Sequence, residues 1–301
     1  MQSVGARILS HLQAHGSQRV LFLTGAGVST QSGIPCYRAP DRPVYRPLQH
    51  AEYVGSELLR QRYWARSMMG WPRMQHALPN AAHLHLASLQ RQGLCSALIT
   101  QNVDTLHSKA GHAGVLELHG SLFQVECLRC AAAAPLLCRN ALQARMLREN
   151  EAWRARYGSL AEERPDGDVE LPSESYLSFH PPACPCCGSP SLKPTVTFFG
   201  GTIPPHIVQH SLLLAEQADA IVVAGSTCST FSAFRLLKGL AARGRPVVVV
   251  KQGGPGRGDA LATLLVEEEV GAALGSLLQE AEQGQQLQAG AQGQQQQQQS
   301  M

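Results

Sequence analysis

Four short apolar segments constrain the fold of this 301-residue chain more than any other feature. Each has the length of one β-strand, and each runs directly into small or polar residues. Helical patterns precede and separate them, such as those over Val4–Ala14 and Ala81–Gln92. Apolar strands that alternate with helices predict a Rossmann-like parallel sheet covered by helices on both faces. The four segments are Arg19–Thr24, Ser96–Thr100, Ala220–Ala224 and Pro246–Val250.

The end of the first segment predicts a ligand site. In open α/β sheets, ligands bind beyond the carboxyl ends of the strands. Gly25, Ala26 and Gly27 follow the first segment directly, and small residues there let backbone amides approach a pyrophosphate. Position 30 is Thr, where the full dinucleotide-binding pattern has a third glycine. On the glycines alone, a tight turn without a ligand is equally compatible with the sequence.

Composition excludes several classes of protein. Hydrophobic residues make up 44% of the chain and charged residues 16%, which is typical of a globular protein. The formal net charge is only +3, so we expect no nucleic-acid partner. No apolar run approaches the roughly 20 residues that span a bilayer, so we expect no membrane segment.

Two stretches interrupt the strand–helix alternation and predict a smaller second domain. Residues 40–80 look helical, and residues 121–193 contain two cysteine pairs around a charged, Pro-rich middle. We therefore assign residues 1–39, 81–120 and 194–278 to the Rossmann-like domain. Residues 279–301 are rich in Gln, Gly and Ala, and we expect this tail to be disordered.

The nine cysteines favour one metal site in a reducing compartment over a disulfide framework. Four of them form two Cys-x-x-Cys pairs, a spacing that places two thiolates on one Zn²⁺. Cys186 lies inside the second pair and is an alternative ligand, but Cys184 and Cys187 have the required spacing and precede Gly188. Buried free thiols are the alternative reading. The predicted zinc ligands are Cys127, Cys130, Cys184 and Cys187.

Polar residues cluster after the second strand and after a following turn. Gln101, Asn102 and Asp104 stand together, and His119 follows nearby. A neutral imidazole suits a general base, while Asn and Asp can orient a sugar hydroxyl or a carboxamide. Spacing alone does not distinguish His119 from the eleven other histidines. The residues by themselves therefore predict a nucleotide-binding α/β domain with a zinc module.

Taken together, an ordered set of strings spread over about residues 4–278 resembles the sirtuins, which are NAD-dependent protein deacylases. Any one string is common, but the ordered set is specific. Arg60–Arg66, Gly70–Pro72 and Pro165–Val169 further resemble the class II branch that contains the mitochondrial sirtuin four. The strings are Thr24–Ser29, Ser32–Pro35 with Tyr37 and Arg38, Thr100–Asp104, Leu118–Gly120, the two cysteine pairs, Lys193–Pro194 with Phe198–Gly200, and Gly225–Thr227.

The resemblance implies an NAD site. It implies phosphate contacts from the glycine turn after the first strand, a mobile cofactor loop that carries Arg38, and a nicotinamide ribose held by Gln101 and Asn102. It places Asp104 at the carboxamide and Val270 near adenine. The full set implied for NAD is Gly25, Ala26, Gly27, Ser29, Pro35, Tyr37, Arg38, Gln101, Asn102, Asp104, Gly225, Ser226, Thr227, Gln252, Gly253, Gly254 and Val270.

The resemblance also implies a reaction. The acyl oxygen of a modified lysine attacks the ribose carbon as nicotinamide leaves, and His119 acts as general base through the ribose hydroxyls, with Asn102 and Asp104 as further catalytic residues. The products are free lysine, nicotinamide and O-acyl-ADP-ribose, and one zinc per chain is structural. The segment of Phe198, Phe199 and Gly200 would pair as a strand with the acyl-lysine protein.

Several positions depart from the family pattern. Cys36 stands where the family usually has Asp, Gly201 where an acidic residue follows, and Gln252 where Asn is expected. Cys228 and Ser229 replace an apolar pair. We expect activity to be retained but slower.

Other functions and two compartments remain open. The alternatives are an NAD-dependent protein mono-ADP-ribosyltransferase and a weakly active NAD- or ADP-ribose-binding protein. A DNA-binding zinc protein is the least favoured. The resemblance alone implies the mitochondrial matrix, with the cytoplasm as the alternative.

Overall fold

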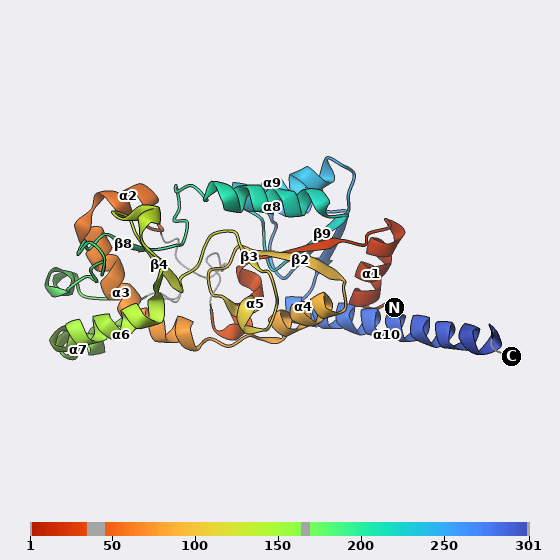
Figure 1. Ribbon diagram of the computed structural model, residues 1–301, viewed down its shortest axis with the longest axis horizontal. Helices are drawn as coiled ribbons and strands as arrows, with labels where there is room; N and C mark the ends of the chain where they lie inside the picture. The colour runs from red at the N-terminus through yellow and green to blue at the C-terminus, as the bar shows by residue number, and fades with distance from the viewer. Residues whose placement is uncertain (1, 35–45, 164–168, 300–301) are drawn as a thin grey trace.

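Six parallel strands form the central sheet of the larger domain (Figure 1). The computed structural model describes residues 2–34, 46–163 and 169–299. The strand order is β11-β10-β9-β1-β2-β3, so the chain builds outward from β1 to one edge and then restarts at β9 on the other side. This confirms the predicted fold class. The crevice between β1 and β9 is the switch point at which such sheets bind ligands. The strands are β1 (Val20–Thr24), β2 (Cys95–Thr100), β3 (Leu116–Glu117), β9 (Ala220–Ala224), β10 (Val247–Lys251) and β11 (Leu264–Glu267).

Alternate residues of the strands pack into two separate cores, because successive side chains of a strand point to opposite faces. Phe22 and Leu98 pack with helices α1, α4 and α10 on one face. Leu21 and Leu23 pack with α8 and α9 on the other. Figure 1 shows these two helical layers on either side of the sheet. The helices are α1 (Val4–Ala14), α4 (Ala81–Arg91), α5 (Leu106–Lys109), α8 (Pro205–Gln217), α9 (Phe231–Ala241) and α10 (Val270–Gln299).

A smaller domain has its own core, at the left of Figure 1. Trp64 and Met68 of its longest helix pack against Val125 and Met146. Arg139 is buried there against the rings of Trp64 and Trp71. The two stretches that interrupt the strand–helix alternation, residues 40–80 and 121–193, therefore share one core. The elements are α2 (His50–Gly55), α3 (Glu57–His76), α6 (Arg139–Glu149) and α7 (Glu151–Tyr157), the antiparallel sheet of β5 (Leu137–Cys138), β4 (Gln124–Cys127) and β8 (Leu192–Pro194), and the hairpin of β6 (Glu162–Glu163) and β7 (Val169–Glu170).

The carboxyl-terminal tail differs from the expectation of disorder for residues 279–301, because α10 continues through it to Gln299. The first turns of α10 pack on α1 and α4, and Gln285 Nε2 donates to the carbonyl of Gln92. Packing supplies the costly nucleus of the helix, and Gln and Ala then extend it readily. None of the described helices, α10 included, is long and apolar enough to cross a membrane.

Candidate active site and zinc centre

The loops after β1 and β9 touch at the carboxyl end of the sheet. The Gly27 amide donates to the carbonyl of Gly225 over 2.9 Å. Gly225 has a φ of +62°, and a Cβ on it would lie 2.6 Å from the Val28 nitrogen. A Cβ on Gly25 would lie 2.7 Å from that of Ser226. Only glycine permits this approach, which leaves the predicted phosphate-binding turn narrow and lined by backbone.

Ser29 joins the predicted catalytic polar residues into one buried cluster. Its hydroxyl donates to Asp104 Oδ2 over 2.7 Å and accepts from Asn102 Nδ2 over 3.0 Å. Asn102 also donates to the carbonyl of Gly25, and the other oxygen of Asp104 accepts from the Leu106 amide. The cluster therefore connects the turn after β1 to the segment after β2. It holds the side chains of Asn102 and Asp104 in single orientations.

Two histidines that the sequence analysis does not name, His83 and His107, lie behind this cluster. His83 Nε2 is 3.4 Å from Ser29 Oγ, and its ring centroid is 4.7 Å from that of His107. His107 Nε2 contacts Thr24 Oγ1 at 2.9 Å. Burial lowers the pKa of His83, an effect that Asp104 partly offsets, and burial lowers that of His107 well below its usual value. Both rings are therefore neutral hydrogen-bonding supports at physiological pH. His83 lies next to Ala82 in a helix whose apolar spacing marks a buried face, and that placement was a usable signal.

Gln101 links the two halves of the sheet. Its Nε2 donates to Ser226 Oγ over 2.8 Å, and its Oε1 accepts from Thr230 Oγ1 over 3.3 Å. Gln101 follows β2, and Ser226 follows β9. The two predicted cofactor residues therefore meet across the switch point.

His119 presents one ring nitrogen as a base. Its Nδ1 lies 3.0 Å from the carbonyl oxygen of Gln101, which can only accept, so the neutral ring carries its proton on Nδ1. Its Nε2 is then an acceptor, and Ser232 Oγ lies 2.9 Å away. Burial lowers the pKa of His119, and the Gln101 carbonyl partly opposes that effect. His119 is therefore largely unprotonated at neutral pH, as a general base must be.

Glu117 is a second ionisable group near this cluster. Burial, and then the negative charge of Asp104, raise the pKa of its carboxyl to about 7. The Glu117 carboxyl is thus poised to change charge near neutral pH. It is not among the predicted site residues.

The predicted adenosine contacts are less closely grouped than the nicotinamide ones. Gln252, Gly253 and Gly254 are exposed after β10, and Thr227 is exposed after β9. Val270 is only 4% exposed and packs in a core of the sheet domain, so its contact with adenine stays a prediction.

The predicted substrate segment lies between the two domains. Phe198 stacks on Tyr53 with ring centroids 4.9 Å apart. The carbonyl of Phe199 accepts from the His50 amide over 2.8 Å, and the Phe199 side chain is 47% exposed. Gly200 turns the chain with a φ of +74°. The Gly201 amide donates to the Phe198 carbonyl over 2.9 Å, which closes the turn. The small domain therefore holds this segment through Gln49–His50, with the Phe199 side chain accessible.

Four cysteines form the predicted metal site. Cys127 Sγ is 3.7 Å from Cys187 Sγ, and Cys130 Sγ is 3.9 Å from Cys184 Sγ. All four sulfurs lie within 4.8 Å of one another. Tetrahedral Zn²⁺ with bonds of about 2.3 Å separates its sulfurs by about 3.8 Å, whereas a disulfide joins them at about 2.05 Å. The set fits one structural zinc.

The backbone around the cysteines resolves which residues are ligands. The Cys186 amide donates to Cys184 Sγ over 3.4 Å, while the exposed Cys186 side chain stands outside the cluster. Gly188 has a φ of +70°, as a tight knuckle requires. With four thiolates around the metal no coordination position is left for substrate, so the zinc is structural rather than catalytic.

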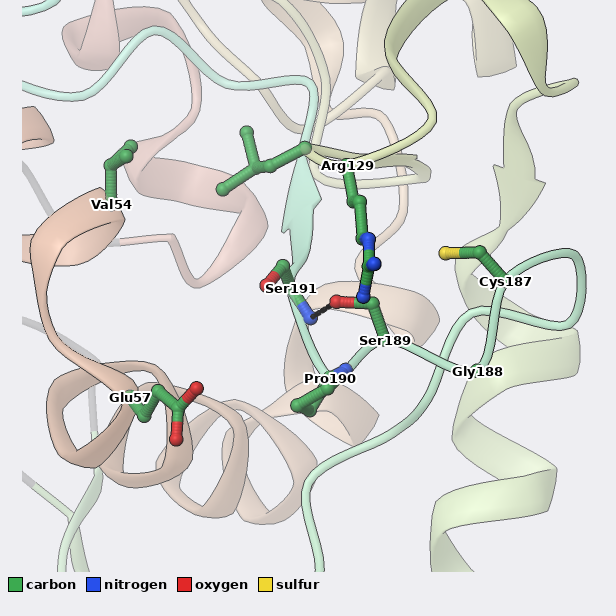
Figure 2. A pocket seen from close by; sticks show the side chains of 9 residues that line it. Val54, Glu57, Arg129, Cys187, Gly188, Ser189, Pro190 and Ser191 are labelled. Carbon is green, nitrogen blue, oxygen red and sulfur yellow. Dashed lines mark hydrogen bonds between the residues drawn. The ribbon is translucent and has the colours of Figure 1, made fainter.

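A pocket of about 450 Å³ opens beside Cys187, between the knuckle and the α2–α3 corner, as Figure 2 shows. Arg129, Ser189 and Glu57 line it, and the Ser191 amide donates to Ser189 Oγ. None of the predicted catalytic residues borders it. This pocket belongs to the zinc module and not to the predicted NAD site.

Four positions of interest lie outside the described residues. These are the predicted cofactor-binding residues Pro35, Tyr37 and Arg38, and the departure at Cys36. Their roles stay predictions.

The sheet order, the glycine turn, the polar cluster and the zinc module together define an NAD-binding α/β protein of the sirtuin type, and comparison with known proteins agrees. The sequence model of the Sir2 family matches residues 25–232. The chain is 45% identical over 242 residues to the NAD-dependent protein deacylase SIR4 of Monosiga brevicollis, covering 80% of this chain and 77% of the relative. It is 42% identical over 260 residues to the mitochondrial NAD-dependent protein lipoamidase sirtuin-4 of Bos taurus, covering 85% and 80%.

Bacterial relatives are equally similar. The NAD-dependent protein deacetylase 3 of Pseudomonas syringae pv. tomato is 43% identical over 249 residues, covering 82% of this chain and 86% of the relative. The solved structure of Sir2Tm bound to a propionylated peptide matches with a TM-score of 0.68 at 26% identity, covering 91% of this chain and 98% of the other. The chain belongs to the Sir2 family.

Proposed function

We propose that this protein is an NAD-dependent protein lysine deacylase. It transfers the acyl group of a modified lysine to ADP-ribose and releases nicotinamide. The observation that carries the proposal is His119, a half-buried neutral imidazole whose bond from Nδ1 to the Gln101 carbonyl leaves Nε2 as its basic nitrogen. Relatives named deacylases and deacetylases support the same reaction.

We assign separate roles to the residues around the NAD site. Asn102 and Asp104, locked together by Ser29, orient the nicotinamide end of NAD with an amide and a carboxylate in fixed positions. The glycine turn packs against the loop after β9, where a Cβ on Gly25 or Gly27 would not fit, and we expect its backbone to lie against the NAD phosphates. Preorganised dipoles of this kind favour charge development in a site that excludes water. NAD supplies the ribose carbon that receives the acyl oxygen.

His119 takes the proton of a ribose hydroxyl once nicotinamide has left. The Nδ1–H group keeps donating to the Gln101 carbonyl, so the imidazole keeps one orientation while Nε2 gains the proton. Gln101 also holds Ser226 across the switch point, which fixes the base relative to the loop after β9.

The acyl-lysine protein enters between the domains. Phe198 is anchored on Tyr53, and we expect the segment from Phe198 to Gly200 to pair with a substrate strand. The zinc of the small domain supports this surface from the other end of β8, because Leu192 pairs with Cys127. No step of the chemistry uses the metal.

A peptide panel tests the proposal. The protein is incubated with NAD and peptides that carry acetyl, longer acyl and acidic acyl groups on lysine, while nicotinamide release and peptide mass are followed. We expect at least one peptide to lose its acyl group, and we expect His119→Ala to abolish the loss while still binding NAD in calorimetry. Transfer of labelled ADP-ribose from NAD onto protein, with every peptide intact, would favour the transferase instead.

The mitochondrial matrix is the proposed compartment. The sirtuin-4 relatives from Bos taurus and Homo sapiens, both named mitochondrial, support it. The similarly close bacterial relatives make the cytoplasm the alternative. Fractionation of native cells distinguishes the two.

A further inference from the structure

A serine on helix α9 is the second hydrogen-bond partner of the proposed base. Ser232 Oγ lies 2.9 Å from His119 Nε2, the nitrogen that has the lone pair. Ser232 is the second residue of α9, and Thr230 is the residue that precedes the helix. The contact therefore comes from the opposite half of the sheet from His119, and it exists only because β9 lies next to β1.

The Ser232 hydroxyl also has a second hydrogen-bond acceptor within reach. Ser232 Oγ is 3.3 Å from Thr230 Oγ1, and Thr230 Oγ1 is in turn 3.3 Å from Gln101 Oε1. The amide oxygen of Gln101 can only accept, so the Thr230 proton points to it and Thr230 Oγ1 keeps lone pairs for Ser232. Ser232 thus has one acceptor on each side, His119 Nε2 and Thr230 Oγ1, and one proton to give.

We propose that Ser232 is a positioning residue for His119, whose hydroxyl donates to Nε2 of the neutral imidazole and accepts from Nε2 once the imidazole is protonated. This inference rests on the proposed function, in which His119 is the general base. When His119 takes a proton from a sugar hydroxyl, the bond broken is that O–H and the bond formed is Nε2–H. Because Nε2 has a single lone pair, Ser232 first swings its proton from Nε2 to Thr230 Oγ1, which frees Nε2 for the sugar proton. Ser232 loses no proton, and its oxygen lone pair then faces the new N–H.

The surroundings of His119 provide few other groups that could stabilise its protonated form. Burial and the Gln101 carbonyl account for the direction of its pKa, and no charged side chain among the described residues contributes to that shift. The charge of Asp104 contributes to the pKa of Glu117, the nearest carboxyl to His119 along the chain, but is not among the causes of the His119 shift. Among the described residues, the acceptors of a protonated His119 would be the Gln101 carbonyl and the Ser232 hydroxyl. Hydrogen bonds to charged groups stabilise by about 1.5–3 kcal/mol, more than bonds between neutral groups.

Two variants and one matched control test the inference. Ser232→Ala removes the hydroxyl, and Ser232→Thr keeps it. Ser211→Ala is the control, because Ser211 lies on α8, which packs against α9, and its hydroxyl donates only to the Val208 carbonyl of its own helix. Thermal unfolding verifies that all three proteins fold.

The first readout does not depend on activity. The His119 ring signal is assigned in labelled protein by its loss in His119→Ala, and its pKa is measured by NMR titration. We expect Ser232→Ala to lower the pKa of His119 below its value in the wild type, and Ser232→Thr and Ser211→Ala to leave it unchanged. An unchanged pKa in Ser232→Ala would overturn the inference, even if no acyl-lysine peptide were ever turned over.

The second readout separates two stages of the reaction. Nicotinamide exchange precedes the action of the base, so we expect Ser232→Ala to leave it within about twofold of the wild type. We expect the kcat for deacylation to fall about tenfold with little change in the peptide KM, as the loss of one hydrogen bond to a charged group predicts. Equal losses of exchange and deacylation would show a merely structural role and contradict the proposal. A wild type with no deacylation at all would refute the proposed function, and the NMR result would still decide the contact.

Discussion

Ser29→Ala is expected to weaken the site and the fold together, because a single hydroxyl bridges two of the proposed catalytic residues. The substitution removes the 2.7 Å bond to the Asp104 carboxylate and the 3.0 Å bond from Asn102. Asn102 keeps its bond to Gly25, but Asp104, which is only 3% exposed, keeps just the Leu106 amide. The loss of one hydrogen bond to a buried charged group destabilises by about 2 kcal/mol. For a chain of 301 residues, that corresponds to a fall in Tm of roughly 3 °C.

Differential scanning calorimetry and NAD titration measure the effect. The matched control is Thr30→Ala, which removes an exposed hydroxyl bonded to the Gly27 carbonyl one residue further along, and its change should stay within about 0.5 kcal/mol. We also expect Ser29→Ala to bind NAD more weakly than the control. If Ser29→Ala unfolded within a degree of the wild type and bound NAD equally well, the bridge would not hold Asp104 as described.

Two further predictions concern the metal and the buried carboxyl. Cys187→Ala should lose most of the roughly one zinc per chain and unfold less cooperatively. The control is Cys186→Ala, which changes the exposed neighbour outside the cluster and should keep the metal. Elemental analysis that shows both variants equally loaded would refute the ligand set. Glu117 has a pKa raised from 4.5 to about 7, so its favourable contribution to stability is complete below pH 4.5 and is lost as the pH rises to about 7. Glu117→Gln should therefore match the wild type at pH 4.5 and be more stable at pH 8, by about 1–2 kcal/mol after allowance for solvent screening. Chemical denaturation at both pH values gives the comparison, and an equal difference at the two would contradict the buried-carboxyl interpretation.

The sheet domain was largely readable from the sequence because its strands are continuous apolar runs. The runs at Ala220–Ala224 and Arg19–Thr24 correspond to β9 and β1 within one residue. Glycines at the strand ends were equally informative, since Gly25 and Gly225 mark places where two backbones meet. The helix over the tail was not predicted, because composition alone does not report that α10 packs on α1 and α4.

Contacts that cross the sheet could not be predicted. Ser232 and Thr230 reach His119 and Gln101 only because the strand order places β9 beside β1, and nothing local in the sequence encodes that order. His83 is buried on an apolar helix face and hydrogen-bonds Asn80 at the start of its helix, so its proximity to Ser29 is again a tertiary fact. The resemblance to the sirtuins grouped His119 with Asn102 and Asp104, whereas spacing alone did not distinguish His119 from the other histidines.

The fate of the acyl group tests the central claim most directly. A peptide that carries an isotopically labelled acyl group on lysine is incubated with NAD and the wild-type protein, and the label is traced by mass spectrometry while nicotinamide is counted. The account predicts that the label moves to ADP-ribose with one nicotinamide released per lysine freed, and that His119→Ala stops the transfer. Label released as a free acid without NAD consumption, or ADP-ribose attached to protein with the acyl-lysine intact, would contradict it.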